Sequence, residues 1–511
     1  MSGTPQHSLI DVWNENLEKF PNKTAFIYQD ETYTFAEIDR MASALSGHLQ
    51  RRFGVKKGDR VCTALPNCIE YVIAYWAIMK LGAVIVPVNT RLSPDDIAYV
   101  LTTTKGEVLF AHGDVWEPVE EALGQAPNIK TVIAVESSAE ETVPFDDLIA
   151  EGRPGDTPPI AEGDMAIIMH TSGTTGRPKG AIMKHGNVLF NLKNAIMTHS
   201  FRHEDVHMLV VPMFHATALY SMLPSNAYQG STVVIAPKPD IKELVGLIEK
   251  HRITTFIGVP TLFYFLTTMK KLEKHDLSSL RLIAYAGSPM PPQTIVRLRE
   301  KFPKIALHNF FGLTETISMT HVLPSQDALE RADSIGKVLP QVRQLIVDDD
   351  GRPVPPGTIG ELCFAKENVI DDYWKRPGLL GEAMIDGKWF RTGDYALVDG
   401  QGYVYLKGRK KEMIIVGGEN VYVNEVENVV LSHPDVLEVA VVGVPATGVR
   451  AYLGEVVKAA VVLKPGSKAT ELDIKRHCSA KLASYEMPQI IQFMDELPRN
   501  PTGKVLKQKL K

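Results

Sequence analysis

The chain has 511 residues, of which 44% are hydrophobic and 23% are charged, and its formal net charge is −5. The length exceeds what one ordinary core holds and predicts two to four subdomains, and the composition is that of a globular protein. The slightly negative charge provides no electrostatic footprint for nucleic acid, so a nucleic-acid-binding function is disfavoured.

The cysteines and the apolar segments narrow the class of protein further. The four cysteines are scattered, and Cys62 and Cys68 lack a second close pair, so we expect reduced thiols rather than a zinc site. Residues 1–9 lack a basic region followed by an apolar core, so no signal peptide is predicted. The most apolar long run, residues 72–88, is interrupted by Lys80 and Pro87 and therefore predicts a core helix and strand. We expect a cytoplasmic protein without a transmembrane segment.

Helical and strand patterns alternate over the first 111 residues. The helical spacing of apolar residues predicts helices over 8–20, 34–51, 67–81 and 94–103. Strands are expected at 25–28, 31–34, 60–64, 83–88 and 108–111. This alternation predicts a parallel sheet with helices on its faces, and the acidic, Gly/Pro-rich residues 137–163 predict a surface excursion.

The most informative stretch, Thr171-Ser172-Gly173-Thr174-Thr175-Gly176-Arg177-Pro178-Lys179-Gly180, follows an apolar run that predicts a buried strand. Glycines let backbone N–H groups approach an anion, hydroxyls add donors, and Lys179 adds a positive charge. The spacing excludes the usual P-loop, because Gly176 is followed by Arg-Pro-Lys-Gly. A flexible linker is the alternative, but the preceding strand and the Pro and Lys favour a phosphate-binding loop.

After this loop the alternation resumes. We expect strands at 208–211, 232–235, 254–259, 280–286 and 306–310, and helices at 241–251, 261–271 and 292–302. From about residue 335 the pattern changes to short strands and tight turns, which predicts a β-rich subdomain. The last hundred residues have their own pattern of strands and helices and predict a separate small α+β domain.

Two further segments have the composition of nucleotide sites. Phe310-Phe311-Gly312-Leu313-Thr314-Glu315 follows a predicted strand, at the edge where open α/β sheets bind ligands. Phe311 offers a flat face for a base, and Glu315 offers a hard oxygen for Mg²⁺. Asp394 could accept hydrogen bonds from ribose hydroxyls. Taken singly, these residues are also consistent with a core aromatic pair, the first turn of a helix and a turn aspartate.

Six segments occur in an order that resembles the acyl-adenylate-forming superfamily, which contains acyl-CoA synthetases, luciferases and peptide-synthetase adenylation domains. They are residues 171–180, 311–315, 391–394, 408–411, 417–427 and 500–504. The resemblance covers almost the whole chain. It implies an α/β fold with a large N-terminal domain of sheets flanked by helices plus a β-rich subdomain, here residues 1–408, a hinge at 409–411, and a small mobile α+β domain at 412–511.

The resemblance also implies a two-step reaction and assigns residues to it. A carboxylate attacks the α-phosphate of MgATP to form acyl-AMP, and the thiol of coenzyme A then displaces AMP. The triphosphate would be held by Thr171, Ser172, Gly173, Thr174, Thr175, Gly176 and Lys179. The rest of the nucleotide would contact Gly287, Ser288, Phe311, Gly312, Thr314, Asp394 and Arg409. Thr174 and Glu315 would flank Mg²⁺, Lys504 would bridge the carboxylate and the α-phosphate, and Lys411 would be the hinge.

The acyl and thiol sites are implied in the same way. The walls of the acyl site would be His215, Tyr220, Phe263, Gly287, Met290 and Leu313, a mostly apolar set without an aspartate placed to pair an amino group. His215 either contacts the carboxylate or gates the acyl channel, or it is a packed structural histidine. Gly417, Gly418 and Glu419 resemble the loop that lines the pantetheine tunnel. Departures from the family pattern at Val423, Ala446 and Glu486 bear on the contacts of the CoA nucleotide.

We therefore expect an ATP-dependent acyl-CoA synthetase for a small-to-medium apolar, alicyclic or aromatic acid. The alternatives are a medium- or long-chain fatty acid ligase, an adenylating enzyme with a carrier-protein or oxygen acceptor, and a nucleotide-binding protein without catalysis. Association into a homodimer is left open.

Overall fold

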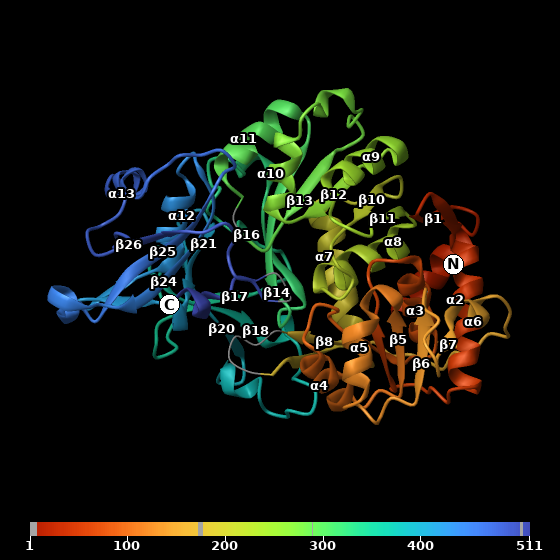
Figure 1. The fold of residues 1–511 in the computed structure, drawn as a ribbon. Coiled ribbons are helices and arrows are strands. Elements are labelled where there is room, and N and C mark those ends of the chain that lie inside the picture. The colour runs from red at the N-terminus through yellow and green to blue at the C-terminus, as the bar shows by residue number, and fades with distance from the viewer. Residues whose placement is uncertain (1–7, 172–176, 289, 501–503) are drawn as a thin grey trace. The chain divides into compact units, whose positions relative to one another are not determined.

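The computed structural model describes residues 8–171, 177–288, 290–500 and 504–511 (Figure 1). The chain divides into two compact units. The first comprises residues 1–285, 304–320 and 367–382, and the second comprises residues 286–303, 321–366 and 383–511. Each unit has its own apolar core.

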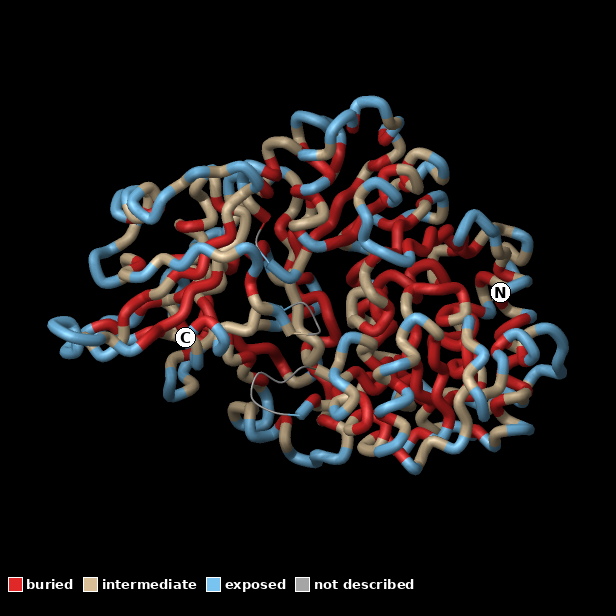
Figure 2. Tube along the Cα trace, in the orientation of Figure 1, coloured by how far each residue is buried: buried red, intermediate tan, exposed pale blue. Residues whose placement is uncertain are grey.

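One sheet of the first unit has the strand order β7-β6-β5-β3-β4-β8-β9. Neighbouring strands run parallel except for β8 and β9, which are antiparallel. The strands are β3 (Arg60–Ala64), β4 (Val84–Pro87), β5 (Val108–His112), β6 (Thr131–Val135), β7 (Val143–Pro144), β8 (Met165–Thr171) and β9 (Lys179–Lys184). The central strands β3, β4 and β5 are buried over nearly their whole length, as expected of a parallel sheet that is covered on both faces (Figure 2).

The helices of this sheet follow the expected alternation. They are α2 (Phe35–Arg51), α3 (Ile69–Lys80), α4 (Pro94–Thr104), α5 (Trp116–Leu123) and α6 (Phe145–Ile149). α2 packs against α3, and α4 packs against α5. α2 begins with a capping box in which Thr34 and Glu37 satisfy each other's backbone N–H groups, so the sequence itself defines the start of this helix.

The other sheet of the first unit contains, in order, β14-β13-β12-β10-β11-β1-β2, all parallel except the β1–β2 hairpin. The strands are β1 (Thr24–Tyr28), β2 (Glu31–Thr34), β10 (Val206–Leu209), β11 (Thr232–Ile235), β12 (Thr255–Gly258), β13 (Leu282–Tyr285) and β14 (Ala306–Leu313). The helices are α1 (Leu9–Lys19), α7 (His185–His199), the π-helix η2 (Thr217–Met222), α8 (Leu223–Gln229), α9 (Ile241–His251) and α10 (Pro260–Thr268).

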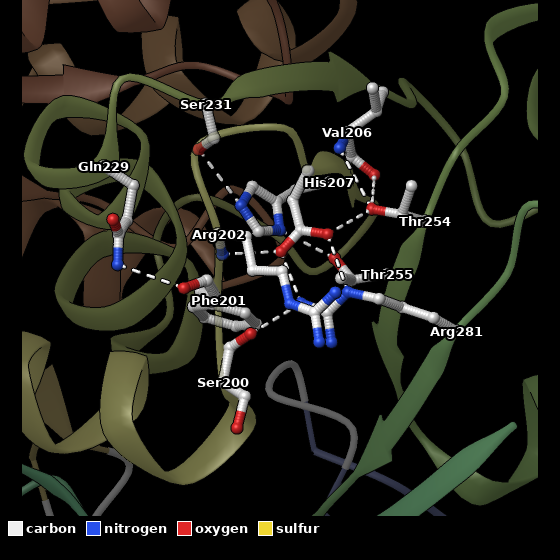
Figure 3. A network of polar contacts seen from close by, with 11 residues as sticks. Ser200, Phe201, Arg202, Val206, His207, Gln229, Ser231, Thr254, Thr255 and Arg281 are labelled. Atoms are coloured by element: carbon white, nitrogen blue, oxygen red, sulfur yellow. Dashed lines mark hydrogen bonds and ion pairs between the residues drawn. The ribbon is translucent and has the colours of Figure 1, made fainter.

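A buried polar network lies at the amino-terminal ends of β10, β12 and β13 (Figure 3). Arg281 Nε donates to Asp205 Oδ1 at 2.8 Å, and the Thr254 hydroxyl donates to the same oxygen at 2.7 Å. His207 contacts the Ser231 hydroxyl at 3.1 Å, and burial lowers the pKa of His207 to about 4. Ligands of open α/β sheets bind at the opposite, carboxyl-terminal edge. This network therefore joins neighbouring strands rather than forming part of a site.

The second unit contains a small antiparallel sheet with the order β17-β18-β20-β19, in which β21 also pairs with β20. The strands are β17 (Gln344–Val347), β18 (Gly360–Ala365), β19 (Met384–Ile385), β20 (Trp389–Val398) and β21 (Val404–Arg409). β15 (Ser318–Leu323) passes from the first unit into the second, where it pairs with β16 (Lys337–Val338), and α11 (Pro292–Lys301) also belongs to the second unit.

The C-terminal part of the second unit is an α+β layer structure. β24 (Val436–Pro445) pairs antiparallel with β25 (Glu455–Leu463), which pairs parallel with β26 (Ile490–Phe493). The remaining elements are β22 (Ile414–Val416), β23 (Glu419–Val421), α12 (Val423–Leu431) and α13 (Glu471–Ser479). Two apolar clusters form on this sheet, one that includes Val426 and Ile474 and one that includes Leu497 and Leu510.

The predicted fold class is confirmed, and most predicted elements lie within a few residues of their expected bounds. The prediction for residues 137–163 is only partly right. β7 and α6 interrupt the loop, and α6 buries Phe145 and Leu148 because its apolar face packs on the sheet. The predictions omitted α5, β6, β9, α7, α8 and β15. The four cysteines are buried free thiols, and no helix of the described residues is long and apolar enough to cross a membrane.

Candidate active site

The phosphate loop lies between two paired strands. β8 ends at Thr171 and β9 begins at Lys179, and these two residues are register partners. The predicted contacts of Ser172, Gly173, Thr174, Thr175 and Gly176 fall outside the described residues. A Cβ atom on Gly180 would lie 2.8 Å from the Ile168 side chain and 3.1 Å from the His170 ring. The hairpin therefore needs glycine at the position after Lys179.

Glu315 lies in the turn that follows β14. The predicted strand end at Phe310 is too early, since β14 continues through Leu313, and no helix follows it. A Cβ atom on Gly312 would lie 1.4 Å from the Ser318 carbonyl oxygen, so the close approach of β14 and β15 requires this glycine. Glu315 Oε1 accepts a hydrogen bond from the Tyr373 hydroxyl at 2.9 Å.

The same tyrosine also contacts the lysine of the phosphate loop. Lys179 Nζ lies 5.4 Å from the centroid of the Tyr373 ring, within the range of a cation–π contact. Within the first unit, Tyr373 therefore contacts two predicted site residues. Its hydroxyl contacts Glu315, the predicted metal ligand, and its ring contacts Lys179, the predicted phosphate-binding cation. Sequence reasoning missed Tyr373, although an aromatic pair, Tyr373-Trp374, beside Asp371 and Asp372 was a readable signal.

A Mg²⁺ ion that is bound to ATP needs only one or two ligands from the protein. Among the described residues, no group of three or more His, Cys, Asp or Glu side chains could hold a metal ion. Mg²⁺ at ATP keeps several waters and uses one or two carboxylates together with phosphate oxygens. The single carboxylate of Glu315, which accepts a hydrogen bond from Tyr373 on one of its two oxygens, fits this requirement.

The predicted acyl wall in the first unit is apolar and neutral. Tyr220 and Phe263 are completely buried. Burial lowers the pKa of His215 to about 4, so this side chain is uncharged near neutral pH. In the ligand-free protein His215 is therefore not a cation, and its neutral form is consistent with a hydrogen-bonding or gating role. Tyr220 lies in the π-helix η2, a type of element that often occurs at functional sites.

In the second unit, Asp394 on β20 and Arg409 on β21 are register partners, and Arg409 Nε lies 2.6 Å from Asp394 Oδ1. Asp394 is therefore a strand residue and not the turn residue that was its alternative. The Asp394 backbone N–H donates to the Thr392 hydroxyl at 3.0 Å. Its Oδ2 atom is buried without a hydrogen-bond partner among the described residues, which fits an acceptor for a ribose hydroxyl.

Burial raises the pKa of Asp394 to about 6, although Arg409 and Lys504 act to lower it. The ionised carboxylate accepts hydrogen bonds, so we expect the affinity for ATP to fall as the pH drops through about 6. In the ligand-free protein the sign is opposite: the contribution of Asp394 to stability is greatest below its ordinary pKa of 3.8 and is lost as the pH rises towards 6.

Asp394→Asn tests this pH dependence. We expect it to weaken ATP binding about tenfold at pH 8 and to flatten the profile near pH 6, as measured by calorimetric titration. Asp386→Asn, at an exposed turn position of the same subdomain, is the matched control. A variant at position 394 that kept the wild-type acidic limb would exclude Asp394 as its source.

Lys504 belongs to the same cluster of the second unit. Partial burial of its ammonium, and then the charge of Arg409, lower the pKa of Lys504, while Glu412 and Asp394 act in the opposite direction. The residue as a whole is exposed to solvent. The second unit thus places the predicted catalytic lysine close to the predicted ribose carboxylate.

Ion pairs attach the chain's last residues to the C-terminal layer. Lys507 Nζ lies 3.1 Å from Glu412 and 2.8 Å from Glu427, and Leu510 is buried in an apolar cluster. Glu412 ends the short 3-10 helix Lys410–Glu412, which contains the predicted hinge residue Lys411. Sequence reasoning missed Lys507 and Glu412, because nothing in their spacing links the tail to this helix.

Two glycine segments complete the predicted contacts in the second unit. Gly417 and Gly418, at φ of +60° and +94°, form the turn of the β22–β23 hairpin, a geometry that favours glycine. This turn accounts for both glycines, and the role of Gly417, Gly418 and Glu419 in CoA binding stays a prediction. Gly287 follows β13 at a φ of +92°, and a Cβ atom there would meet nothing within 4 Å.

Two family descriptions match the chain: AMP-binding enzyme over residues 13–374, and the AMP-binding enzyme C-terminal domain over residues 425–504. The chain belongs to the AMP-binding enzymes. Both matches include segments that hold predicted site residues, from Thr171 to Glu315 and at Lys504.

Curated relatives of this AMP-binding enzyme are acyl-CoA ligases. A long-chain-fatty-acid–CoA ligase of Escherichia coli O6:H1 is 33% identical over 99% of this chain and 94% of its own length. A feruloyl-CoA synthase of an Amycolatopsis species is 34% identical over 95% of each chain. The protein is accordingly an AMP-forming acid–thiol ligase.

Solved structures agree with this conclusion. The anthranilate CoA ligase AuaEII, solved with anthranoyl-AMP, superimposes with a TM-score of 0.91 at 28% identity, covering 100% of this chain and 98% of that one. The o-succinylbenzoate CoA synthetase of Bacillus subtilis, solved with ATP and magnesium ion, gives a TM-score of 0.85 at 29% identity over 98% of each chain. ATP, Mg²⁺ and coenzyme A are the cosubstrates and cofactor of this enzyme.

Proposed function

We propose that the enzyme joins a small-to-medium apolar, alicyclic or aromatic carboxylic acid to coenzyme A. The observation that carries this choice is the predicted acyl wall, where Tyr220 and Phe263 are fully buried and His215 is uncharged. An acid with an amino group or a second charged group would lose the hydration of that group there without gaining a partner of opposite charge among these side chains.

In the first step, a carboxylate oxygen of the acid attacks the α-phosphorus of ATP, and the bond to the pyrophosphate oxygen breaks. Both reactants are negative, so a cation between them lowers the barrier. We assign this role to Lys504 and the binding of the triphosphate to Lys179. Asp394 holds the ribose with Oδ2, an atom without a hydrogen-bond partner in the described part of the chain. Mg²⁺, when bound, neutralises phosphate charge, and Glu315 supplies a carboxylate for it.

In the second step, the sulfur of coenzyme A attacks the acyl carbon, and the bond between that carbon and the AMP oxygen breaks. The first step needs Lys504 close to the reacting groups, and the second needs room for the thiol. A hinge at Lys411, with residues 412–511 moving as one body, would allow both. The ion pairs of Lys507 support this proposal, since they tie the segment that carries Lys504 to the body that would move.

The curated relatives include enzymes for acids inside and outside the proposed class. The long-chain-fatty-acid–CoA ligase and the feruloyl-CoA synthase are 33% and 34% identical to this chain, so similarity does not choose between a fatty and an aromatic acid. An apolar pocket discriminates single methylenes by only ~1–3 kcal/mol, so acids of neighbouring size should compete as substrates.

A coupled assay with ATP, Mg²⁺ and coenzyme A tests the proposal over a panel of short, branched, alicyclic, aromatic and long-chain acids. We expect the highest kcat/KM with an alicyclic or aromatic acid and stoichiometric release of AMP, pyrophosphate and thioester. A preference for long-chain acids would overturn the proposed acid class. Pyrophosphate release that stops after one turnover with coenzyme A present would point instead to a carrier-protein or oxygen acceptor.

A further inference from the structure

The segment 367–382 returns to the first unit between two stretches that belong to the second. It contacts α4, β9 and the turn after β14, and the last two contacts involve backbone groups. The Trp374 N–H donates to the Gly180 carbonyl at 2.7 Å, Tyr373 forms an isolated β-bridge with Ala181, and the Ile370 N–H donates to the Glu315 carbonyl at 2.9 Å. This segment, called the strap here, therefore bridges the phosphate-loop hairpin and the turn that carries Glu315.

Tyr373 is the strap residue that contacts both functional side chains. Its hydroxyl donates to Glu315 Oε1 at 2.9 Å, and its ring lies 5.4 Å from Lys179 Nζ. Only 8% of its surface is exposed. A phenol is protonated near neutral pH, so the Tyr373 hydroxyl acts as a hydrogen-bond donor to Glu315.

We propose that Tyr373 is a positioning residue for adenylation. Its hydroxyl orients the Glu315 carboxylate towards Mg²⁺, and its ring holds the Lys179 ammonium beside the triphosphate through a cation–π contact. This inference rests on the proposed function of the site and deepens it. A carboxylate has two oxygens, and a donor bound to one of them leaves the other in a defined direction for a metal ion. Groups that hold a metal ligand in place typically change metal affinity 10- to 100-fold when they are removed.

A purely structural role for Tyr373 is the competing explanation, because the strap also packs through its backbone. Tyr373→Phe separates the two explanations. The variant keeps the ring, the cation–π contact and the packing, and it removes only the hydroxyl that reaches Glu315. Tyr373→Leu additionally removes the aromatic face under Lys179.

Tyr99 provides a matched control in the same unit. Its ring also makes a cation–π contact, with the Arg177 guanidinium 5.3 Å from the ring centroid. Its hydroxyl, however, accepts a hydrogen bond from Arg376 Nη2 at 3.0 Å and does not contact a carboxylate of the described residues. Tyr99→Phe thus removes a phenol hydroxyl beside an arginine and leaves Glu315 untouched.

The experiment measures the binding of Mn²⁺, as a spectroscopic substitute for Mg²⁺, by electron paramagnetic resonance in the presence of the non-hydrolysable α,β-methylene analogue of ATP. We expect Tyr373→Phe to weaken Mn²⁺ binding 10- to 100-fold, with an unchanged melting temperature and unchanged binding of the analogue in EDTA. Tyr373→Leu should weaken analogue binding in EDTA as well, because Lys179 loses its support. Tyr99→Phe should behave as wild type.

Turnover provides the second measurement. For Tyr373→Phe we expect the half-saturating Mg²⁺ concentration in ATP–pyrophosphate exchange to rise by the same factor, while the rate at saturating Mg²⁺ stays close to that of wild type. Wild-type Mn²⁺ affinity in Tyr373→Phe, or a lower melting temperature with equal losses of analogue binding with and without metal, would overturn the proposal. If no acid supported exchange but Tyr373→Phe still lost Mn²⁺ affinity, the positioning role would stand and the proposed acid class would fail.

Discussion

Lys504→Ala is expected to slow adenylation about a thousandfold while leaving the conversion of supplied acyl-adenylate to thioester close to the wild-type rate. The acid and the α-phosphate repel each other, and the ammonium of Lys504 offsets this repulsion only in the first step. One charge pair at ~4 Å and an effective dielectric constant near 20 contributes ~4 kcal/mol. If this energy is realised mainly in the transition state, it corresponds to about a thousandfold in rate.

The two half-reactions are measured separately, the first by ATP–pyrophosphate exchange and the second by thioester formation from synthetic acyl-adenylate. Lys504→Arg keeps the positive charge but replaces the ammonium with a planar guanidinium, so it should retain part of the rate of ATP–pyrophosphate exchange. Lys509→Ala removes an exposed lysine of the same tail and should change neither half-reaction. Equal loss of both half-reactions in Lys504→Ala would mean that the side chain supports the structure of residues 412–511 rather than the chemistry.

Lys411→Pro is expected to produce the complementary pattern, with thioester formation slowed about a hundredfold and adenylation largely kept. Proline fixes φ near −65° and removes a backbone N–H group, so it restricts the rotation that a hinge at this position needs. Lys411 is the second residue of the one-turn helix Lys410–Glu412, and the first turn of a helix tolerates proline. Misplacement of reacting groups by about 1 Å already costs on the order of a hundredfold in rate.

Rapid-quench measurements of each half-reaction distinguish a hinge from a general defect. Lys411→Ala removes the same side chain but keeps the backbone free, so it should form thioester at nearly the wild-type rate. A loss of adenylation as large as the loss of thioester formation in Lys411→Pro would contradict the alternation of the two steps about this residue.

Local sequence signals accounted for most of the secondary structure. The helix predicted over 34–51 agrees with α2, which begins at the capping box of Thr34 and Glu37, and the predicted bounds of α9 and β11 agree with the structure. The sequence analysis did not predict elements that lack a strong local signal. β9 and α7 follow a loop whose Pro178 argued against a helix, and their formation depends on pairing with β8 and on packing in the first unit.

The candidate site divides in the same way. The residue types indicated a phosphate-binding loop, a metal carboxylate and a ribose carboxylate, and the resemblance to the acyl-adenylate-forming superfamily implied the catalytic lysine. The partners of these residues were not predictable, because Tyr373 is 58 residues from Glu315 along the chain and no local pattern connects them. The assignment of Asp394 to a turn was one alternative, and pairing of β20 with β21 excluded it.

By itself, the sequence determined the class of chemistry, since charges, glycines and hydroxyls near one another in the chain limit what a loop can bind. Only the tertiary structure decided the state of the individual groups. Burial, which depends on contacts between distant segments, makes His215 neutral and raises the pKa of Asp394 to about 6. Among the residues that the structure describes, Asp394 Oδ2 has no hydrogen-bond partner, and it is the fold that brings Tyr373 between Lys179 and Glu315.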